Sequence, residues 1–313
     1  MRIELIDVDG HNFPNLPLMK ISAYHKIRGD SVEWYNPLAA WANPPDRVYM
    51  SKVFTFTPDY SHPINAKEII KGGTGYSCLD GGAKLPEEIE HVYPDYSIYY
   101  DRIPKMKETA YGFLTRGCPR GCGFCIVGKK EGKIARKVAD LREFWNGQKN
   151  ITLLDPNLFA CKEWRKLSNQ LINSGAWVDF SQGCDIRIMT EEKAEYIKRM
   201  KIKQVHFAWD RYEDKENIVP KFKEFKEITQ WDYRKLGVYV LCNFNTTFDQ
   251  DLERVYTLRN LGYNPYVMLY EKEKIPAGHR LRKLQRWVNN KIIFNSCKQF
   301  EDFNQRNKNA KKI

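Results

Sequence analysis

Short apolar runs alternate with segments of helical periodicity along the first hundred residues. The runs that predict strands cover residues 2–8, 31–34, 47–56 and 68–70. Between the first two strands, apolar side chains recur at helical spacing from residue 16, which predicts a helix that stops at Gly29. Strand and helix in this order indicate a parallel sheet with helices on its faces. We therefore expect residues 1–104 to form a Rossmann-like α/β domain, whose last strand and outgoing linker lie within residues 85–107.

The same alternation repeats six times from residue 110 onward. The predicted strands cover residues 111–116, 151–155, 177–183, 204–210, 237–245 and 264–270. The predicted helices between them cover residues 135–145, 164–175, 190–200, 220–231 and 252–261. A further helical stripe begins a basic C-terminal extension at residues 276–313, and we expect disorder from about residue 304. The overall fold class is therefore α/β, followed by a helical tail.

Charge and hydropathy limit the partners and the cellular location that we expect for this chain. The 313 residues carry a formal net charge of +12, which is densest from Lys274 to Ile313. Two interpretations of this tail stay open: a surface for nucleic acid, or a solvated helical face with a frayed basic end. No apolar run approaches ~18 residues, and the N-terminus lacks the features of a signal peptide. We expect a cytoplasmic protein with no membrane partner.

Three of the eight cysteines lie close together, at Cys118, Cys122 and Cys125. Glycines beside them free the backbone to curl, so that three thiolates can converge on one inorganic group. A closed structural zinc site needs four protein ligands, whereas three leave one metal position open. A zinc knuckle with an unrecognised fourth ligand stays open as the alternative. The other five cysteines are scattered singly, and we interpret them as small buried apolar residues.

The run from Tyr111 to Gly132, with its Cys-x3-Cys-x2-Cys spacing and Phe124 before the last cysteine, resembles the signature of radical S-adenosylmethionine (radical SAM) enzymes. The resemblance implies a [4Fe-4S] cluster on the three cysteines, with S-adenosylmethionine (SAM) on the fourth iron. It also implies a partial (β/α)6 barrel at residues 105–275 and an external one-electron reductant such as flavodoxin or ferredoxin. SAM would be cleaved to a 5'-deoxyadenosyl radical that acts on a substrate the sequence does not identify.

Polar side chains follow the predicted strands, where parallel α/β folds place their ligands. The cofactor-binding candidates are Phe124, Asp155, Asn157, Ser181, Gln182, Arg187, Asp210 and Asn243. The resemblance implies that Asp155 and Asn157 meet the methionine amino group of SAM. Arg187 could pair with the SAM carboxylate in a two-pronged contact, Asp210 could bond the ribose, and Asn243 lies near the expected adenine. For each of them the alternative is a polar residue that caps the next helix.

The N-terminal domain resembles the cobalamin-binding domain that precedes many radical SAM cores. Its residues Asp9 and His11, then Ser51, then the pair Gly72-Gly73 stand where that family carries Asp-x-His-x-x-Gly, Ser and Gly-Gly. The chain departs from the pattern at Pro14, which replaces the glycine that leaves room beside the corrin. Two interpretations therefore stay open: a domain that binds cobalamin, or a Rossmann scaffold in which His11 is an ordinary loop residue.

The leading hypothesis is a radical SAM enzyme that acts on an unidentified substrate. A cobalamin-dependent radical SAM methyltransferase is the first alternative. The second is a metal-stabilised nucleic-acid-binding protein that uses the cysteine loop and the basic tail without radical chemistry.

Overall fold

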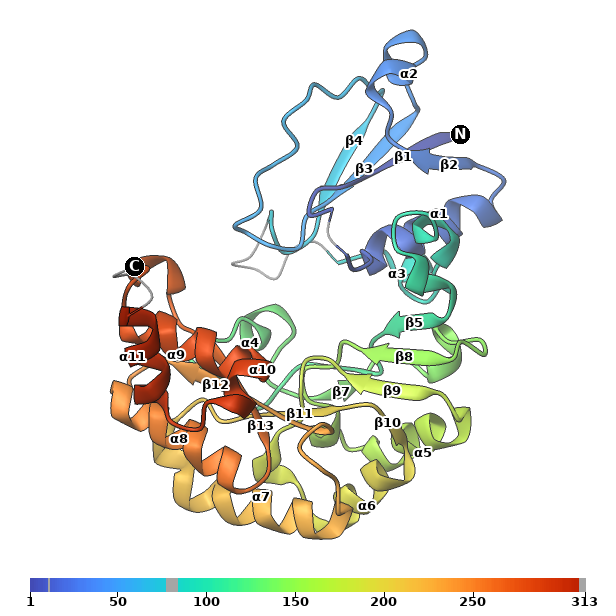
Figure 1. Ribbon diagram of the computed structural model, residues 1–313. Coiled ribbons are helices and arrows are strands. Elements are labelled where there is room, and N and C mark those ends of the chain that lie inside the picture. The colour runs from blue at the N-terminus through green and yellow to red at the C-terminus, as the bar shows by residue number, and fades with distance from the viewer. Residues whose placement is uncertain (11, 77–83, 310–313) are drawn as a thin grey trace. The chain divides into compact units, whose positions relative to one another are not determined.

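The computed structural model describes residues 1–10, 12–76 and 84–309. The chain is a mixed α/β protein with parallel sheets (Figure 1). It divides into two compact units, Met1–Val178 and Asp179–Ile313. The predicted α/β class is therefore confirmed. The predicted domain limits at residues 104 and 275 stay predictions.

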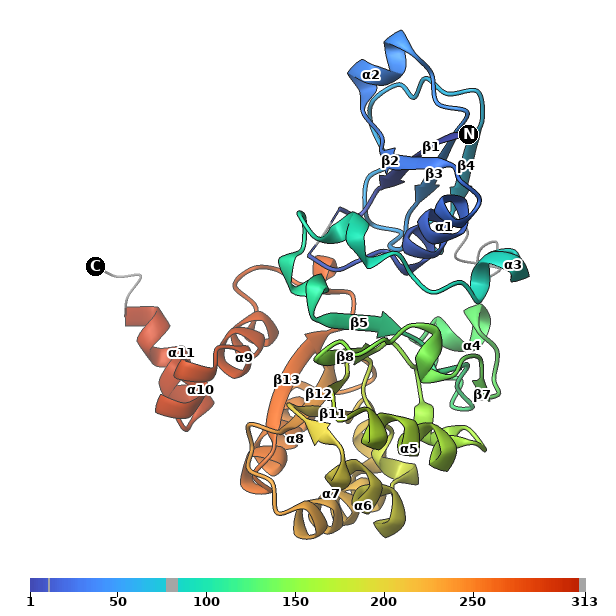
Figure 2. The ribbon, with the colours of Figure 1, turned by 90° about the vertical axis from the view of Figure 1, so that its right-hand side faces the viewer.

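The first sheet contains four parallel strands in the order β2-β1-β3-β4. These strands are β1 (Arg2–Asp7), β2 (Ser31–Trp34), β3 (Arg47–Ser51) and β4 (Ile69–Gly72). Helix α1 (Leu16–Ile27) lies against the sheet (Figure 2). Leu18 and Ile21 of the helix pack against Ile3 and Leu5. The predicted parallel sheet of residues 1–104 is thus confirmed, because apolar side chains of the strands and of the helix bury one another.

Strand β3 ends at Ser51, five residues before the predicted end at 56. The reason is the buried carboxylate of Asp9, which accepts hydrogen bonds from the backbone nitrogens of Val53 (2.5 Å) and Phe54 (3.3 Å). These donors are then not available to continue the ladder with a neighbouring strand. After β4 the chain turns at Gly73, where φ is +98° and an added Cβ would lie 2.3 Å from the Lys52 carbonyl oxygen.

The expected last strand within residues 85–107 is wrong. Helix α3 (Glu87–Glu90) and two 3-10 turns, Tyr96–Tyr99 and Pro104–Lys107, occupy this segment. Two buried tyrosines hold it in place: the Tyr99 hydroxyl donates to Asp7 Oδ2 (2.6 Å) and the Tyr96 hydroxyl donates to the Phe144 carbonyl (2.6 Å). Hydrogen bonds from these side-chain hydroxyls, not strand pairing, hold the segment to the rest of the unit.

The first unit continues with β5 (Thr109–Gly112) and β8 (Asn150–Leu153), which pair in parallel. Strand β9 (Trp177–Phe180) begins beside β8, where the Trp177 nitrogen donates to the Lys149 carbonyl (2.9 Å). Helix α5 (Trp164–Ser174) precedes it and ends as predicted at Gly175, whose φ is +63°. That conformation is open to glycine at little cost, which is why the helix stops there.

The predicted helix at residues 135–145 is wrong. Strand β7 (Arg136–Lys137) pairs antiparallel with β6 (Thr115–Arg116), and a short 3-10 turn, Leu141–Glu143, follows. Leu141 and Phe144, which lie at helical spacing in the sequence, are both buried, Leu141 in this turn and Phe144 directly after it. Tertiary pairing with β6 therefore outweighs the local helical periodicity.

The second unit contains the parallel sheet β11-β12-β13, formed by Val205–Ala208, Leu236–Cys242 and Asn264–Leu269. Before the C-terminal helices this unit also contains α6 (Glu191–Arg199), β10 (Lys201–Ile202), α7 (Lys215–Thr229) and α8 (Phe248–Asn260). Phe207 of β11 packs edge-on against Phe222 and Phe225 of α7. Thr190 caps α6, and its side chain accepts a hydrogen bond from the Lys193 nitrogen. Each predicted strand after residue 110 thus corresponds to an observed one, whereas the six-stranded barrel stays a prediction.

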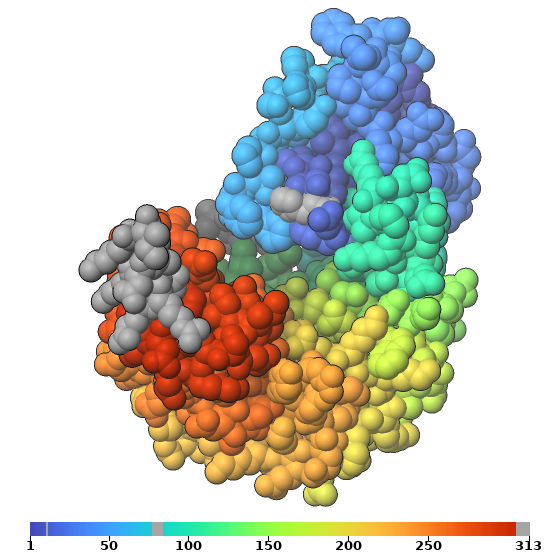
Figure 3. Space-filling model, in the orientation of Figure 1, coloured from blue at the N-terminus to red at the C-terminus, as the bar shows by residue number. Residues whose placement is uncertain are grey.

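The C-terminal segment forms α9 (Arg280–Asn289), α10 (Lys291–Ser296) and α11 (Phe300–Asn309), part of the surface coloured red in Figure 3. The expected disorder from residue 304 is wrong as far as Asn309, because α11 continues to that residue. Phe300, buried against Trp287 of α9, anchors the start of the helix. Among the residues described, no helix combines the length and the apolar character needed to span a bilayer.

A buried ion pair joins α8 to two strand ends in the second unit. Asp251 and Arg254 are both fully buried, and Arg254 Nη2 donates to Asp251 Oδ1 (2.5 Å). The same guanidinium donates to the carbonyls of Trp209 (2.6 Å) and Leu241 (2.8 Å). It thereby ties the carboxyl ends of β11 and β12 together.

Asp251→Ala should lower the free energy of unfolding by ~3–5 kcal/mol, because it leaves the Arg254 charge buried without its counter-ion. Urea titration of the purified chain measures this loss. Asp249→Ala is the matched control, since Asp249 lies in the same first turn of α8 but is exposed, and it should change stability by no more than ~0.5 kcal/mol. Equal losses in the two variants would contradict the structural role of the pair.

Candidate functional site

The cysteine loop, residues 117–135, is closed at its neck by strands β6 and β7. Beyond that pairing, the Glu131 carboxylate accepts hydrogen bonds from the Gly117 nitrogen (3.1 Å) and from Arg116 Nη1 (3.1 Å). The Cys118 nitrogen donates to the Gly132 carbonyl (3.1 Å). The neck therefore fixes where Cys118 leaves the sheet.

Gly117 cannot be exchanged freely at this neck. Its φ is +87°, and an added Cβ would lie 2.2 Å from the carbonyl oxygen of Ile134. Both facts demand glycine, because the left-handed conformation and the close backbone approach each exclude a side chain.

Inside the loop the three cysteines have different exposure. Cys118 and Cys122 are partly buried, whereas Cys125 is exposed. The Cys125 nitrogen donates to the Cys122 carbonyl (2.9 Å), which forms a tight turn around the partly buried Phe124. Helix α4 (Val127–Lys130) completes the loop. None of these three cysteines forms a disulfide.

The remaining described cysteines, Cys161, Cys184, Cys242 and Cys297, are buried, which confirms their interpretation as small apolar residues. Cys78 lies outside the described residues. In the described ranges, no group of three or more His, Cys, Asp or Glu side chains is arranged to hold a metal ion. The three loop cysteines are thus near one another in sequence and share one closed loop, and metal ligation by them stays a prediction.

Asp155 anchors the strand that leads into this loop. It follows β8, is buried, and accepts hydrogen bonds from the Leu114 nitrogen (3.1 Å), the Thr115 nitrogen (2.5 Å) and Thr115 Oγ1 (2.6 Å). Burial raises the pKa of this carboxyl to about 6, against the opposing effect of those hydrogen bonds. Its predicted contact with SAM stays a prediction, but both oxygens already serve the fold.

Asn157 brings the end of β8 into contact with the first cysteine. Its Nδ2 lies 3.6 Å from Cys118 Sγ and donates a hydrogen bond to it. The side chain is buried, and Oδ1 has no hydrogen-bond partner in the part of the chain that the structure describes. The structure thus joins one predicted cofactor-binding residue to one predicted metal ligand.

Two more predicted residues, Arg187 and Asp210, belong to a charged cluster in the second unit. Arg187 pairs with Asp185 (Nε to Oδ1, 2.8 Å) and with Asp214 (Nη1 to Oδ2, 3.3 Å). Asp210 follows β11, and burial raises its pKa to about 6 while the charges of Arg187 and Arg254 oppose the rise. The cluster is therefore a place where a carboxyl group can gain or lose a proton near neutral pH.

The other predicted residues of the second unit are Ser181, Gln182 and Asn243. The Ser181 carbonyl accepts from the Tyr239 hydroxyl (3.4 Å), and Gln182 is exposed. Asn243 follows β12 with a φ of +67°; its backbone nitrogen donates to Asp251 Oδ2 (3.1 Å) and its Nδ2 donates to the Tyr270 carbonyl (3.2 Å). Asn243 thus has its conformation set by the buried Asp251.

The sequence did not single out the residues that support the site. Thr115 and Glu131 hold the cysteine loop, and Asp251 with Arg254 holds the strand ends of the second unit. Asp251 and Arg254 lie three residues apart in α8, a spacing that is a sequence signal for an ion pair on a helix, but the predicted helix begins only at residue 252. The burial of the pair could not be seen in the sequence.

In the N-terminal domain the predicted cobalamin contact His11 lies outside the described residues. Ser51 is buried, and its Oγ accepts a hydrogen bond from Asn15 Nδ2 (2.9 Å). The Asn15 nitrogen in turn donates to the Tyr99 hydroxyl (3.1 Å). Ser51 is thus part of an internal network at the carboxyl ends of β1 and β3, and cobalamin binding stays a prediction.

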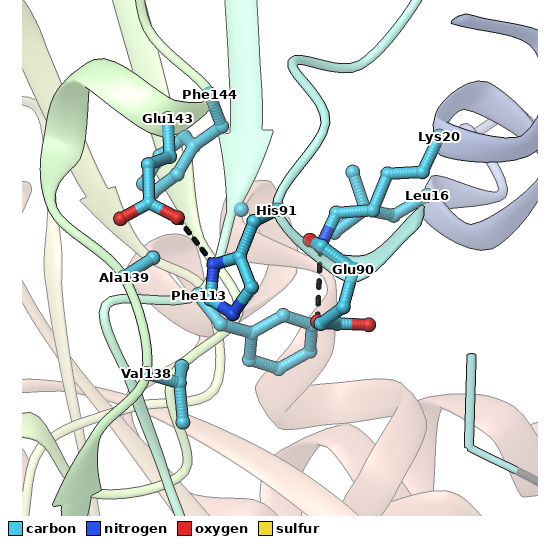
Figure 4. A pocket seen from close by; sticks show the side chains of 10 residues that line it. Leu16, Lys20, Glu90, His91, Phe113, Val138, Ala139, Glu143 and Phe144 are labelled. Carbon is cyan, nitrogen blue, oxygen red and sulfur yellow. Dashed lines mark hydrogen bonds and ion pairs between the residues drawn. The ribbon is translucent and has the colours of Figure 1, made fainter. Parts of the chain in front are cut away.

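The first unit contains a small cleft whose lining includes neither the loop cysteines nor the predicted cofactor-binding residues. Two ion pairs border it, His91 Nδ1 with Glu143 Oε2 (2.8 Å) and Lys20 Nζ with Glu90 Oε1 (3.0 Å) (Figure 4). Apolar groups of Leu16, Phe113, Val138 and Phe144 form much of the remaining wall. The hydrogen bond to Glu143 is the main cause that raises the pKa of His91.

Several cations of the basic tail are engaged within the tail or with neighbouring backbone. Arg282 donates to the Lys272 carbonyl (2.6 Å), Lys291 to the Pro265 carbonyl (2.7 Å), and Lys283 to Asn304 Oδ1 (3.0 Å). Burial lowers the pKa of Lys291 to about 8. These side chains stabilise the C-terminal helices, and a nucleic-acid surface on the tail stays a prediction.

Comparison of the chain with protein-family models and with curated proteins found no match.

Gly117→Ala should open the neck of the cysteine loop, since the backbone must shift to relieve the contact with Ile134. The strain is on the order of 1–3 kcal/mol, and trypsin should cut after Lys129 or Lys130 several-fold faster than in the unchanged chain. Gly128→Ala is the control in the same loop, because its nearest heavy atoms lie 3.9 Å from the added Cβ. Equal cleavage rates in both variants would show that Gly117 does not set the loop.

His91→Gln should destabilise the chain more at pH 5.5 than at pH 9. The folded state raises the pKa of His91 above its ordinary 6.5, so the stabilisation is present below that value and is lost as pH rises through the raised pKa. Because the side chain is half exposed, we expect an effect below ~1 kcal/mol. Urea unfolding of both proteins at both pH values measures it, and a loss independent of pH would argue against the ion pair.

Proposed function

We propose that this chain is a radical SAM enzyme. Cys118, Cys122 and Cys125 would bind a [4Fe-4S] cluster, and reductive cleavage of SAM would yield a 5'-deoxyadenosyl radical that acts on a substrate not yet identified. One observation carries the proposal: a loop closed by β6 and β7, just after the parallel strand β5, carries three cysteines that form no disulfide, and the Asn157 amide is bonded to the first of them.

The donor set of the loop suits such a cluster. Three thiols match a cluster that keeps one iron open for another ligand, whereas a closed zinc site would need a fourth donor. Asn157 adds a buried oxygen with no partner among the described residues, an acceptor suited to an N–H group of a ligand. When bound, the cluster would supply the electron that SAM accepts on cleavage.

The chain's own residues would bind and orient the reactants. Asp155 and Glu131 hold the ends of the segment that carries the thiols. Arg187 is a proposed partner of the SAM carboxylate and Asp210 of the ribose hydroxyls, both within the proposed (β/α)6 barrel of residues 105–275. An external one-electron reductant such as flavodoxin or ferredoxin would serve the cluster.

A cobalamin-dependent methyltransferase is the second candidate. The observation that favours it is the N-terminal parallel sheet with β1 between β2 and β3, since open sheets of this kind bind ligands at the carboxyl edge where the strand order reverses. Retention of corrin absorbance after incubation with cobalamin and desalting would support this candidate. Loss of all corrin on desalting would leave the simpler radical SAM reaction.

Anaerobic reconstitution with iron and sulfide should give about four iron atoms per chain, and reduction in the presence of SAM should release methionine and 5'-deoxyadenosine. Cys118→Ser should lose most of the iron and the cleavage products, because one of three cluster ligands is gone. Cys297→Ala, which removes a buried thiol of the second unit, is the control and should retain both.

Two results would overturn the proposal for the unchanged chain. One is a metal content of no more than about one iron or zinc per chain, which a cluster with roughly four irons excludes. The other is a complete cluster that never cleaves SAM under reducing conditions. Iron and sulfide analysis together with chromatography of the products separates these results.

A further inference from the structure

The side chain of Asn157 has no role in capping the helix that follows it. Asn157 is the N-cap of the short turn Leu158–Ala160, but its side chain makes no capping hydrogen bond, and its backbone carbonyl alone accepts from Ala160. The general alternative for polar residues at strand ends, a local cap, therefore does not explain this side chain.

The contact with sulfur is what distinguishes this amide. Its Nδ2 donates to Cys118 Sγ at 3.6 Å, while Oδ1 is buried without a partner in the described residues. An amide that is 2 % exposed and makes so few hydrogen bonds costs stability relative to an apolar side chain of similar shape. A buried amide that lowers stability in this way is better explained by a function than by a role in folding.

An N–H donor at a thiolate that binds a cluster has a known physical effect. The donor draws negative charge toward itself and favours the reduced, more negative form of the cluster, which raises the reduction potential. The same hydrogen bond restricts the rotation of the cysteine side chain and so fixes the position of that ligand.

We propose that Asn157 is a positioning residue that holds Cys118 through its amide and raises the reduction potential of the cluster bound there. This inference rests on the proposed function, since it needs a cluster on the three cysteines. It adds to that function a residue that controls how readily the electron is delivered.

The test compares reconstituted Asn157→Leu with the unchanged chain. Leucine has a similar volume and no donor, so stability to urea should be equal or higher while the reduction equilibrium shifts at least about tenfold toward the oxidised cluster, a fall of about 59 mV in the one-electron potential. Potentiometric titration followed by electron paramagnetic resonance measures the potential. Loss of iron to a chelator should also be several-fold faster in the variant.

Asn157→Ala removes the same donor without adding apolar volume, and it serves if the leucine variant does not fold. Asn146→Leu is the control, because Asn146 is exposed, and its potential should not change. An unchanged potential in the folded Asn157 variants overturns the inference alone. An unchanged chain that binds no cluster overturns the proposed function and the inference with it.

Discussion

The site in the first unit depends on the hydrogen bonds of one buried carboxylate. Asp155 accepts from the Leu114 nitrogen and from both the nitrogen and the hydroxyl of Thr115, so the end of β8 holds the segment that enters the cysteine loop. Without this carboxylate, two backbone donors and a buried hydroxyl would need new partners. Asp155 thereby holds the backbone just before the neck, where Glu131 and the Gly132 carbonyl bond Gly117 and Cys118.

The second unit uses the same physical device with a different pair of groups. The buried Arg254 bonds the carbonyls at the ends of β11 and β12, and Asp251 balances its charge and fixes the backbone of Asn243. In both units a buried ionisable group satisfies backbone atoms at the carboxyl ends of parallel strands. Parallel α/β folds place their ligands at that edge, and rigid strand ends are what a precise site needs.

In the N-terminal sheet and the basic tail, several polar and charged side chains that could have bound a ligand make hydrogen bonds within the fold instead. Ser51 accepts from Asn15, and cations such as Arg282 and Lys291 bond backbone carbonyls. A net charge of +12 therefore does not translate directly into a binding surface. Asn157 differs from these residues, because its side chain makes no hydrogen bond to a backbone group.

The sequence by itself determined the class of fold and the place of the thiols. The alternation of apolar runs predicted the parallel sheets and located the strands. It could do so because a helix or strand that buries one face carries apolar residues at a regular spacing in the sequence. The spacing of Cys118, Cys122 and Cys125 defined the loop. Tertiary structure alone decided the rest: β7 instead of a helix near residue 136, 3-10 turns instead of a strand before residue 107, and the meeting of Asn157 with Cys118. These depend on contacts between distant segments, such as Asp155 with Thr115 and Tyr96 with Phe144, for which local periodicity carries no signal.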